Sequence, residues 1–309
     1  MNYHLIIVMR RYIITLLALV AFSLTIHGQL LYKISGNGLK KSSYLLGTYH
    51  FAASSFTDSI PGFHKAMGEA EQACGEIEMD LMKRPEVLVK LQKAMMLPDG
   101  VTLASLLNKE EMDALNMSLK NLLGADLTNP MVNAQMGKMN PAAINLQLVS
   151  LMYLKHDPTF NLDDGIDAYV QTLAKKGKKP VLSFETVDEQ IDVLFGKQSI
   201  ERQKVLLMCL VNNQEYMMNI TDHIVAAYYS QDLNKIEELE DVKTNDQCDP
   251  TEEENDALVY GRNANWMTKI PDIMKSKSTF FAVGAAHLVG EKGLLSLLSK
   301  AGYKVEPCK

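Results

Sequence analysis

The chain has 309 residues, of which 47% are hydrophobic and 22% charged, and its formal net charge is −6 at pH 7. These values are ordinary for a globular protein with one large domain or two small ones. A negative charge without a basic face argues against nucleic acid as a partner.

The N-terminal segment has the pattern of a signal peptide. Arg10 and Arg11 precede an apolar run over residues 12–26, and His27-Gly28 follow. A basic stretch, an apolar stretch and a small residue are the parts of a secretory signal. An uncleaved anchor is the alternative, although about 15 apolar residues are few for a bilayer span. We therefore expect a signal peptide over residues 1–28, no membrane span after cleavage, and a secreted or periplasmic domain over residues 29–309.

The first part of that domain is predicted to be a β-hairpin. Strands are expected over residues 30–35 and 43–48, separated by Gly36-Asn37-Gly38. The second strand leads into Gly47-Thr48-Tyr49-His50, a Gly-x-x-His motif. A helix over residues 61–70 and a third strand over residues 74–79 follow.

Glu76 and Glu78 lie in that third strand. Residues at alternate positions of a strand face the same side, so both carboxylates are expected on one face. The spacing does not say which of the two points toward a site.

The middle of the chain is predicted to be mostly helical. Helical patterns cover much of residues 85–176 and 187–240, and a short strand over residues 180–185 separates them and ends at Glu185. A further helix over residues 252–270 carries Arg262, Asn263 and Trp266, the only tryptophan.

The C-terminal part repeats the Gly-x-x-His pattern. An apolar run up to Val283 predicts a buried strand, and Gly284-Ala285-Ala286-His287 follows, then a helix over residues 291–300 and a strand over 303–306. A histidine just past the carboxyl end of a buried strand faces the crevice where open α/β sheets bind ligands. We therefore predict an α/β fold, with a central mixed sheet, βα units at both ends of the chain and a large helical insertion in the middle, in one domain.

The four cysteines allow three complete pairings, and export would permit disulfides. Cys248 and Cys308 lie in polar, loop-like contexts, so we expect them to be bonded to each other. Cys74 and Cys209 lie in apolar contexts and are expected to be buried free thiols. Because the sequence has no Cys-x-x-Cys motif, a cysteine zinc site is not expected.

Several side chains near the predicted strand ends are candidates for chemistry: His50, His287, Glu78, Glu185, Arg262 and Glu76. Two imidazoles with one or two carboxylates suit a divalent metal, which could activate water while a carboxylate acts as general base. Arg262 could stabilise an oxyanion or hold a substrate carboxylate. Each residue also has a structural alternative: a satisfied strand-end histidine, a solvated carboxylate, an acidic helix start, or a surface ion pair.

Five short blocks of the sequence occur in an order that resembles the TraB/GumN family, which includes the TIKI metalloproteases. The blocks are Leu45-Leu46-Gly47-Thr48-Tyr49-His50, Glu78-Met79-Asp80, residues 179–186 with Gln190, Arg262-Asn263, and residues 283–290. They extend over nearly all of the chain after the predicted signal peptide.

The resemblance implies an α/β fold and, for TIKI-type members, a peptidase that depends on manganese or cobalt. The implied metal ligands are His50, His287 and Glu78, with zinc as a further candidate metal. Arg262 would join these three as a catalytic residue, and Glu185 and Asn263 match blocks that we assign to substrate binding.

The sequence therefore supports two hypotheses. The first is a secreted or periplasmic metal-dependent hydrolase, most simply a TIKI-like metallopeptidase that acts on a peptide or protein. The alternative is a periplasmic binding protein that holds a peptide or small ligand in the same crevice without turnover.

Overall fold

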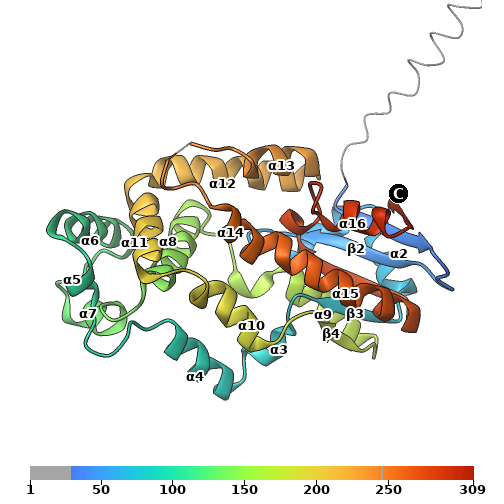
Figure 1. Ribbon diagram of the computed structural model, residues 1–309, viewed down its shortest axis with the longest axis horizontal. Helices are drawn as coiled ribbons and strands as arrows, with labels where there is room; N and C mark the ends of the chain where they lie inside the picture. Colours follow the sequence, from blue (N-terminus) through green and yellow to red (C-terminus); the bar gives the residue numbers. More distant parts are fainter. Residues whose placement is uncertain (1–28, 245) are drawn as a thin grey trace, which may run out of the picture.

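The computed structural model describes residues 29–244 and 246–309, and Figure 1 shows their arrangement. The predicted signal peptide over residues 1–28 lies outside the described residues. Within the described ranges, no helix is both long and apolar enough to cross a bilayer.

A single six-stranded sheet holds the two ends of the chain together, in the order β4-β3-β5-β2-β1-β6. Its strands are β1 (Leu31–Gly36), β2 (Ser43–Thr48), β3 (Gln72–Gly75), β4 (Val181–Ser183), β5 (Thr279–Gly284) and β6 (Tyr303–Pro307). The four strands β4, β3, β5 and β2 are mutually parallel, whereas β1 pairs antiparallel with β2, and β6 with β1. The predicted mixed sheet is confirmed.

The hairpin between β1 and β2 forms where the turn residues predicted it. Gly36, Asn37 and Gly38 all have positive φ, the backbone conformation that glycine and asparagine adopt most easily. Residue Tyr32 lies opposite Leu45 in the resulting antiparallel register. Both strands are largely buried, which fits their apolar sequences.

Helices cover both faces of the sheet. On one face, Phe280 of β5 packs edge-on against Phe63 of α2 (Phe63–Glu69). The Phe63 ring also stacks on Tyr169 of α9 (Ile166–Lys176). On the other face, the neighbouring Phe281 stacks on Phe184, which stacks on Trp266 of α15 (Gly261–Ser276). This alternation places β5 at the centre of the core, as its apolar sequence predicts.

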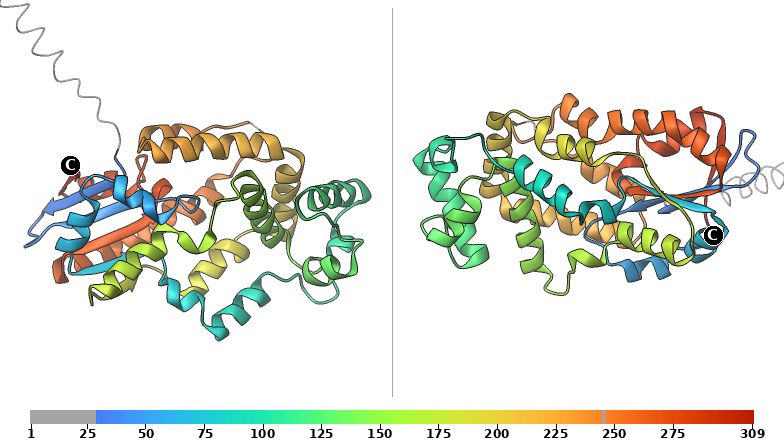
Figure 2. Two further views of the ribbon diagram at one scale, coloured as in Figure 1. Left: turned by 180° about the vertical axis from the view of Figure 1, so that it is seen from behind. Right: turned by 90° about the horizontal axis from the view of Figure 1, so that it is seen from below.

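The predicted helical insertion is present as a group of helices beside the sheet (Figures 1 and 2). Its members are α4 (Pro85–Ala94), α5 (Leu103–Leu106), α6 (Lys109–Leu123), α7 (Pro130–Met136), α8 (Pro141–His156) and α11 (Ile200–Asn212). These helices enclose a second hydrophobic cluster that includes Leu115, Ile144, Leu148 and Leu207. The single-domain organisation stays a prediction.

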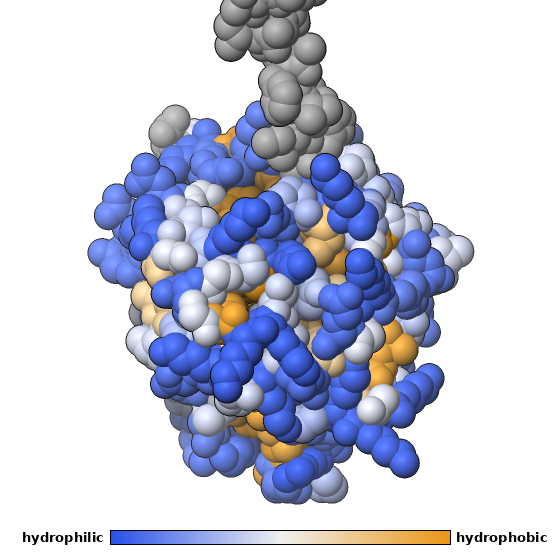
Figure 3. All heavy atoms as spheres, turned by 90° about the vertical axis from the view of Figure 1, so that its right-hand side faces the viewer, coloured by the Kyte–Doolittle hydropathy of each residue, from blue (hydrophilic) through white to orange (hydrophobic). Residues whose placement is uncertain are grey.

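Two helices return from this group to the sheet. Figure 1 shows α12 (Gln214–Tyr229) and α13 (Leu233–Glu240) leading back toward the strands, where Tyr228 and Ile236 join the core of the sheet. On the sheet the chain ends with α16 (Leu294–Lys300) and β6. Figure 3 looks at the end of the molecule on the right of Figure 1, and this surface is mostly polar with scattered apolar residues.

The predicted helix over residues 252–270 is interrupted and longer than expected. It consists of α14 (Glu252–Asn255), a π-helical turn η4 (Asp256–Tyr260) and α15, which continues through Pro271 to Ser276. At the junction, a Cβ atom on Gly261 would lie 2.8 Å from the carbonyl oxygen of Asp256, so only glycine fits there without a shift. Single π-turns inside helices are frequent at functional sites, and this one directly precedes Arg262.

The third strand is shorter than predicted, because β3 ends at Gly75. The chain after it is held by Gln171 of α9, whose amide donates to the carbonyl of Ile77 and accepts from the backbone N–H of Met79. Glu78 is therefore the residue that precedes α3 (Met79–Met82), not a strand residue. The expectation that Glu76 and Glu78 share one strand face is wrong.

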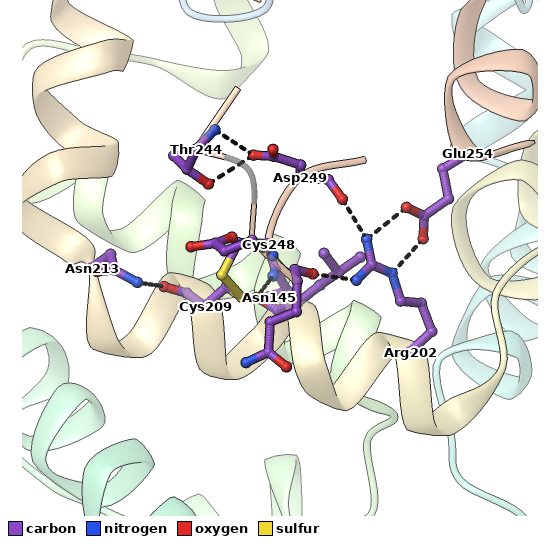
Figure 4. The surroundings of a disulfide bond; sticks show 11 residues. Asn145, Arg202, Cys209, Asn213, Thr244, Cys248, Asp249 and Glu254 are labelled. Atoms are coloured by element: carbon purple, nitrogen blue, oxygen red, sulfur yellow. Dashed lines mark hydrogen bonds and ion pairs between the residues drawn. A yellow bond between two sulfur atoms is a disulfide. The ribbon is translucent and has the colours of Figure 1, made fainter. Parts of the chain in front are cut away.

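The predicted Cys248–Cys308 disulfide is also wrong, since Cys248 is bonded to Cys209. Cys209 lies on α11, and Cys248 lies in the loop between α13 and α14, as Figure 4 shows. Cys308 follows β6 on the sheet, where its backbone N–H bonds to Leu31, so it is held far from that loop by the sheet pairing. Cys308 and the buried Cys74 are free thiols.

Arg202 fastens the same loop to α11 (Figure 4). Its guanidinium donates to both carboxylate oxygens of Glu254, at 2.8 and 2.7 Å, and to the backbone carbonyls of Gln247 and Asp249. Glu254 is also part of the capping box that begins α14 at Thr251. The disulfide and Arg202 together fix the segment that leads into α15.

Replacing both bonded cysteines by serine should lower the free energy of unfolding by about 2–4 kcal/mol, because the bond closes a long loop of the unfolded chain. Denaturant unfolding of C209S/C248S beside wild type measures this. A matched C74S/C308S variant should keep the disulfide. A thiol count that leaves any residues other than Cys74 and Cys308 free in the unfolded wild type would contradict the pairing.

Candidate active site

The four parallel strands deliver one polar side chain each to the same edge of the sheet. Across the sheet, Glu185 follows β4, Glu76 follows β3, His287 follows β5 and His50 follows β2. The register aligns these ends, since Gly75 pairs with both Ser183 and Ala282, and Thr48 pairs with Gly284. Carboxyl ends of parallel strands are where open α/β sheets place their sites.

Arg262 of α15 joins three of these strand ends. Its Nε and Nη2 donate to the two carboxylate oxygens of Glu185 at 2.7 and 3.0 Å, and Nη2 also donates to Glu76 Oε2 at 2.5 Å. Its Nη1 lies 3.1 Å from His287 Nε2. Only 13% of the Arg262 side chain is exposed, so these are buried, charge-assisted contacts, and the surface ion pair considered above is excluded.

Glu185 receives further donors that fix its position. Trp266 Nε1 donates to Oε1 at 2.9 Å, and Gln190 Nε2 donates to Oε2 at 2.6 Å. Thr186, the next residue, caps helix α10 (Val187–Ile191) with Glu189 as its capping-box partner. Glu185 is therefore a buried anchor for Arg262, and Gln190 is a supporting residue for Glu185.

His287 is held in one tautomer by Asn263. The Asn263 amide nitrogen donates to the carbonyls of His287 and Lys292, so its Oδ1 accepts, and this oxygen lies 2.7 Å from His287 Nδ1. Nδ1 must then carry the proton, which leaves the Nε2 lone pair facing Arg262 and Glu76. Burial lowers the pKa of His287 to about 4. Glu76 acts in the opposite direction, and Arg262 and His50 lower the pKa further, so the ring is neutral at pH 7.

Asn263 lies behind His287 and away from the surface of the protein. It is fully buried, and its three hydrogen bonds all serve the turn around His287. The structure thus places it behind the histidine rather than at the surface of the site, although the sequence block assigned it to substrate binding.

Glu76, rather than Glu78, lies beside the arginine and the histidine. Its Oε1 accepts from the backbone N–H of Gly284 at 2.8 Å and lies 3.7 Å from His287 Nε2. Burial opposes ionisation, but His287, Arg262 and the Gly284 amide together hold the pKa of the Glu76 carboxyl below its ordinary value. Glu78 lies instead 3.3 Å from Lys175 of α9, which also pairs with Asp80.

His50 shares the edge with His287 but is far more open. Its side chain is 83% exposed, and its Nδ1 lies 3.7 Å from Oδ2 of Asp167, in the first turn of α9. The other oxygen of Asp167 accepts from Thr48 Oγ1 at 2.9 Å. The sequence places Asp167 at a helix start, where an acidic residue is ordinary, so no local pattern distinguished it.

A cavity of about 260 Å³ opens beside Arg262 and Glu185. It lies between α10 and the π-turn η4, and its remaining lining residues include Asp192, Lys197 and Asp256. The buried part of the site is therefore bordered by a space that a substrate group can enter.

The charges of the site suit a divalent cation. Glu76, Glu185 and Asp167 are three carboxylates, and in the described part of the chain Arg262 is the only Lys or Arg that pairs with any of them. Burial and the charge of Glu76 raise the pKa of the Asp167 carboxyl, against the effects of His50 and Thr48. Among the described residues, no three His, Cys, Asp or Glu side chains form a ready metal cage. The residues fit a metal by donor type and charge, with His50, His287 and Glu76 as the donors nearest the strand ends.

Three proteins with similar sequences are named as metalloproteases. The chain is 25% identical over 305 residues to "Metalloprotease TIKI2" of Danio rerio, which covers 85% of this chain and 58% of that protein. It is 23% identical over 313 residues to "Metalloprotease TIKI homolog" of Nematostella vectensis, with 86% and 65% covered. It is 25% identical over 302 residues to "Metalloprotease TIKI1" of Xenopus tropicalis, with 85% and 59% covered.

The chain thus spans about three fifths of the length of these relatives. No solved structure matches it significantly. The model of the TraB/PrgY/gumN family matches residues 30–307, which include the whole sheet and every residue of the site. The chain belongs to the TraB/PrgY/gumN family.

Proposed function

We propose that this protein is a metal-dependent hydrolase, and more specifically a peptidase, that works at the carboxyl edge of its four parallel strands. The observation that carries the proposal is the cluster of Arg262, His287, Glu76 and Glu185 at that edge, with His50 following the neighbouring strand. The names of the relatives, all metalloproteases, support the same reaction class.

His50, His287 and Glu76 would hold the metal, which would act as a Lewis acid toward the scissile carbonyl. The tautomer of His287 supports this role, because Asn263 Oδ1 accepts the hydrogen bond of Nδ1–H and so keeps the proton off Nε2, whose lone pair could then bind a metal. Glu76 replaces the Glu78 of the sequence-based assignment, since Glu78 is paired with Lys175 outside this cluster.

Arg262 would stabilise the negative charge that develops on the carbonyl oxygen during hydrolysis. Its two carboxylate partners hold the guanidinium in place before substrate arrives. Because its five N–H groups already face Glu185, Glu76, the Leu258 carbonyl and His287 Nε2, a direct hydrogen bond to the oxyanion would require the contact with His287 to be given up. Glu185 would act through Arg262, and the adjoining cavity would receive part of the substrate.

We also propose that the protein is exported. The basic and apolar pattern of residues 10–28 supports export, and so does the Cys209–Cys248 disulfide, because such bonds persist mainly in oxidising compartments.

Glu76→Gln should reduce peptide hydrolysis by about 100-fold or more, because it removes a buried charge at the reacting centre. Glu78→Gln makes the same change two residues away, beside Lys175, and should leave hydrolysis within about twofold of wild type. Rates on a mixed peptide library, in the presence of manganese, cobalt or zinc, measure both. Equal losses in the two variants, or loss in Glu78→Gln alone, would contradict the assignment of Glu76.

Wild-type protein should bind manganese, cobalt or zinc, and the double variant His50→Ala/His287→Ala should lose that binding. Titration calorimetry on chelator-treated protein measures it. His64→Ala/His156→Ala removes two imidazoles away from the sheet edge and is the matched control. Peptide binding that persists in the double variant, without metal or turnover in wild type, would support the binding-protein alternative instead.

The metal-free protein should lose stability as the pH falls from about 6.5 to about 4. The buried His287 stays neutral through this range, whereas the unfolded chain takes up the proton at the ordinary pKa, so acid favours the unfolded chain. Compared with its value above pH 6.5, the free energy of unfolding should be lower by an amount on the order of 3 kcal/mol near pH 4. Denaturant unfolding of wild type and His287→Gln over this range should give a shallower pH dependence for the variant, and parallel curves would contradict the burial of a neutral ring.

A further inference from the structure

The two Gly-x-x-His imidazoles have one feature in common beyond their place on the sheet. In each, Nδ1 faces a side-chain oxygen that is supplied by a helix: Asn263 of α15 for His287, and Asp167 of α9 for His50. Metal-binding and catalytic histidines are commonly held in this way, because the partner on one ring nitrogen fixes the tautomer and orients the other nitrogen.

Asp167 is fixed on a rigid part of the fold. It lies in the first turn of α9, next to Ile166, which is fully buried, and one turn from the buried Val170. Its Oδ1 accepts from the hydroxyl of Thr48, the last residue of β2 and itself buried. With Oδ1 bonded to Thr48, Oδ2 points toward His50, the second residue after the end of β2.

The backbone before His50 is held from another side. The Tyr228 hydroxyl donates to the carbonyl oxygen of Gly47 at 3.0 Å, and Tyr228 is fully buried in the core of the sheet. Thr48 and Gly47 therefore anchor the turn, while the side chain of His50 itself is exposed. In the described residues, His50 is the only residue with which Asp167 forms an ion pair.

We propose that Asp167 is the positioning residue of His50: it accepts the hydrogen of Nδ1 and so presents the Nε2 lone pair to the site. The present separation of 3.7 Å is longer than a hydrogen bond, and such contacts often shorten only when a site is occupied. A carboxylate in this position also makes the opposite ring nitrogen of His50 a stronger electron-pair donor. Asn263 is neutral and has a weaker effect of this kind on His287.

The consequence for turnover rests on the proposed hydrolase function, whereas the tautomer does not. The two can therefore be tested separately, and the failure of one is distinguishable from the failure of the other.

The tautomer is measured by NMR on full-length protein with ¹⁵N-labelled histidine, at a pH where the ring is neutral, with His50→Gln to assign the signals. Wild type should show His50 with its proton on Nδ1. Asp167→Ala should shift it toward the Nε2–H form that free imidazole side chains favour in water. Asp167→Asn keeps the shape of the side chain but has one oxygen; with that oxygen accepting from Thr48, its amide nitrogen faces His50 Nδ1, so this variant should also shift the ring toward the Nε2–H form.

Asp163→Ala is the matched control, because it removes an exposed carboxylate four residues earlier and should change nothing. A His50 signal that is identical in wild type and Asp167→Ala would overturn the proposal. Should Asp167→Ala fail to fold, Asp167→Ser, which cannot reach His50 but can still bond Thr48, decides the same question.

The kinetic test uses the same variants. Asp167→Ala should lower kcat about 10–100-fold with little change in KM, the usual loss for a partner of a metal-bound or catalytic histidine, and Asp167→Asn should not restore it, because its amide nitrogen cannot accept the hydrogen of Nδ1. Unchanged kcat in Asp167→Ala would overturn the positioning role. If the wild-type protein hydrolyses no peptide, the proposed hydrolase function is wrong, and the role of Asp167 is then decided by the tautomer measurement alone.

Discussion

The buried contacts of Arg262 are the interaction on which the rest of the site depends. One guanidinium from α15 holds carboxylates that follow two different strands and contacts the imidazole that follows a third. Loss of one partner of a buried ion pair typically costs 3–5 kcal/mol, because the remaining charge is left without compensation. The relative positions of β3, β4 and β5 at their carboxyl ends are thus tied to one side chain.

This arrangement makes the site part of the core rather than an addition to its surface. Trp266, which donates to Glu185, also stacks on Phe184 and lies against His287, so packing and polar contacts use the same residues. The neutral state of His287 follows from this burial. His50, by contrast, is open to solvent, so the edge carries one buried imidazole and one exposed imidazole.

The parts of the fold that local patterns determine were predictable from the sequence. The hairpin follows from Gly36-Asn37-Gly38, and β5 follows from an apolar run of residues 280–283 that must be buried on both faces. The contact of Arg262 with Glu185 and His287 joins three residues that the sequence had singled out, because each lies at or near a strand end or in a recognisable block. These features need no knowledge of distant contacts.

The parts of the fold that depend on contacts between residues far apart in the sequence were not predictable from local patterns. The end of β3 depends on Gln171, which lies about a hundred residues away in sequence and shapes the turn that separates Glu76 from Glu78. The partner of Cys248 depends on which helix packs under its loop, and a cysteine in an apolar helix is most often a free thiol. Asp167 looked like an ordinary residue of a first helical turn until β2 was placed beside it.

The helical insertion has its own hydrophobic cluster, and its segments leave the sheet at the carboxyl ends of β3 and β4. The insertion also reaches the site directly, because Phe51, the residue after His50, stacks on Tyr153 of α8 with the ring centroids 4.1 Å apart. The two parts of the fold are therefore coupled: a substitution in α8 at this contact can move the turn that carries His50.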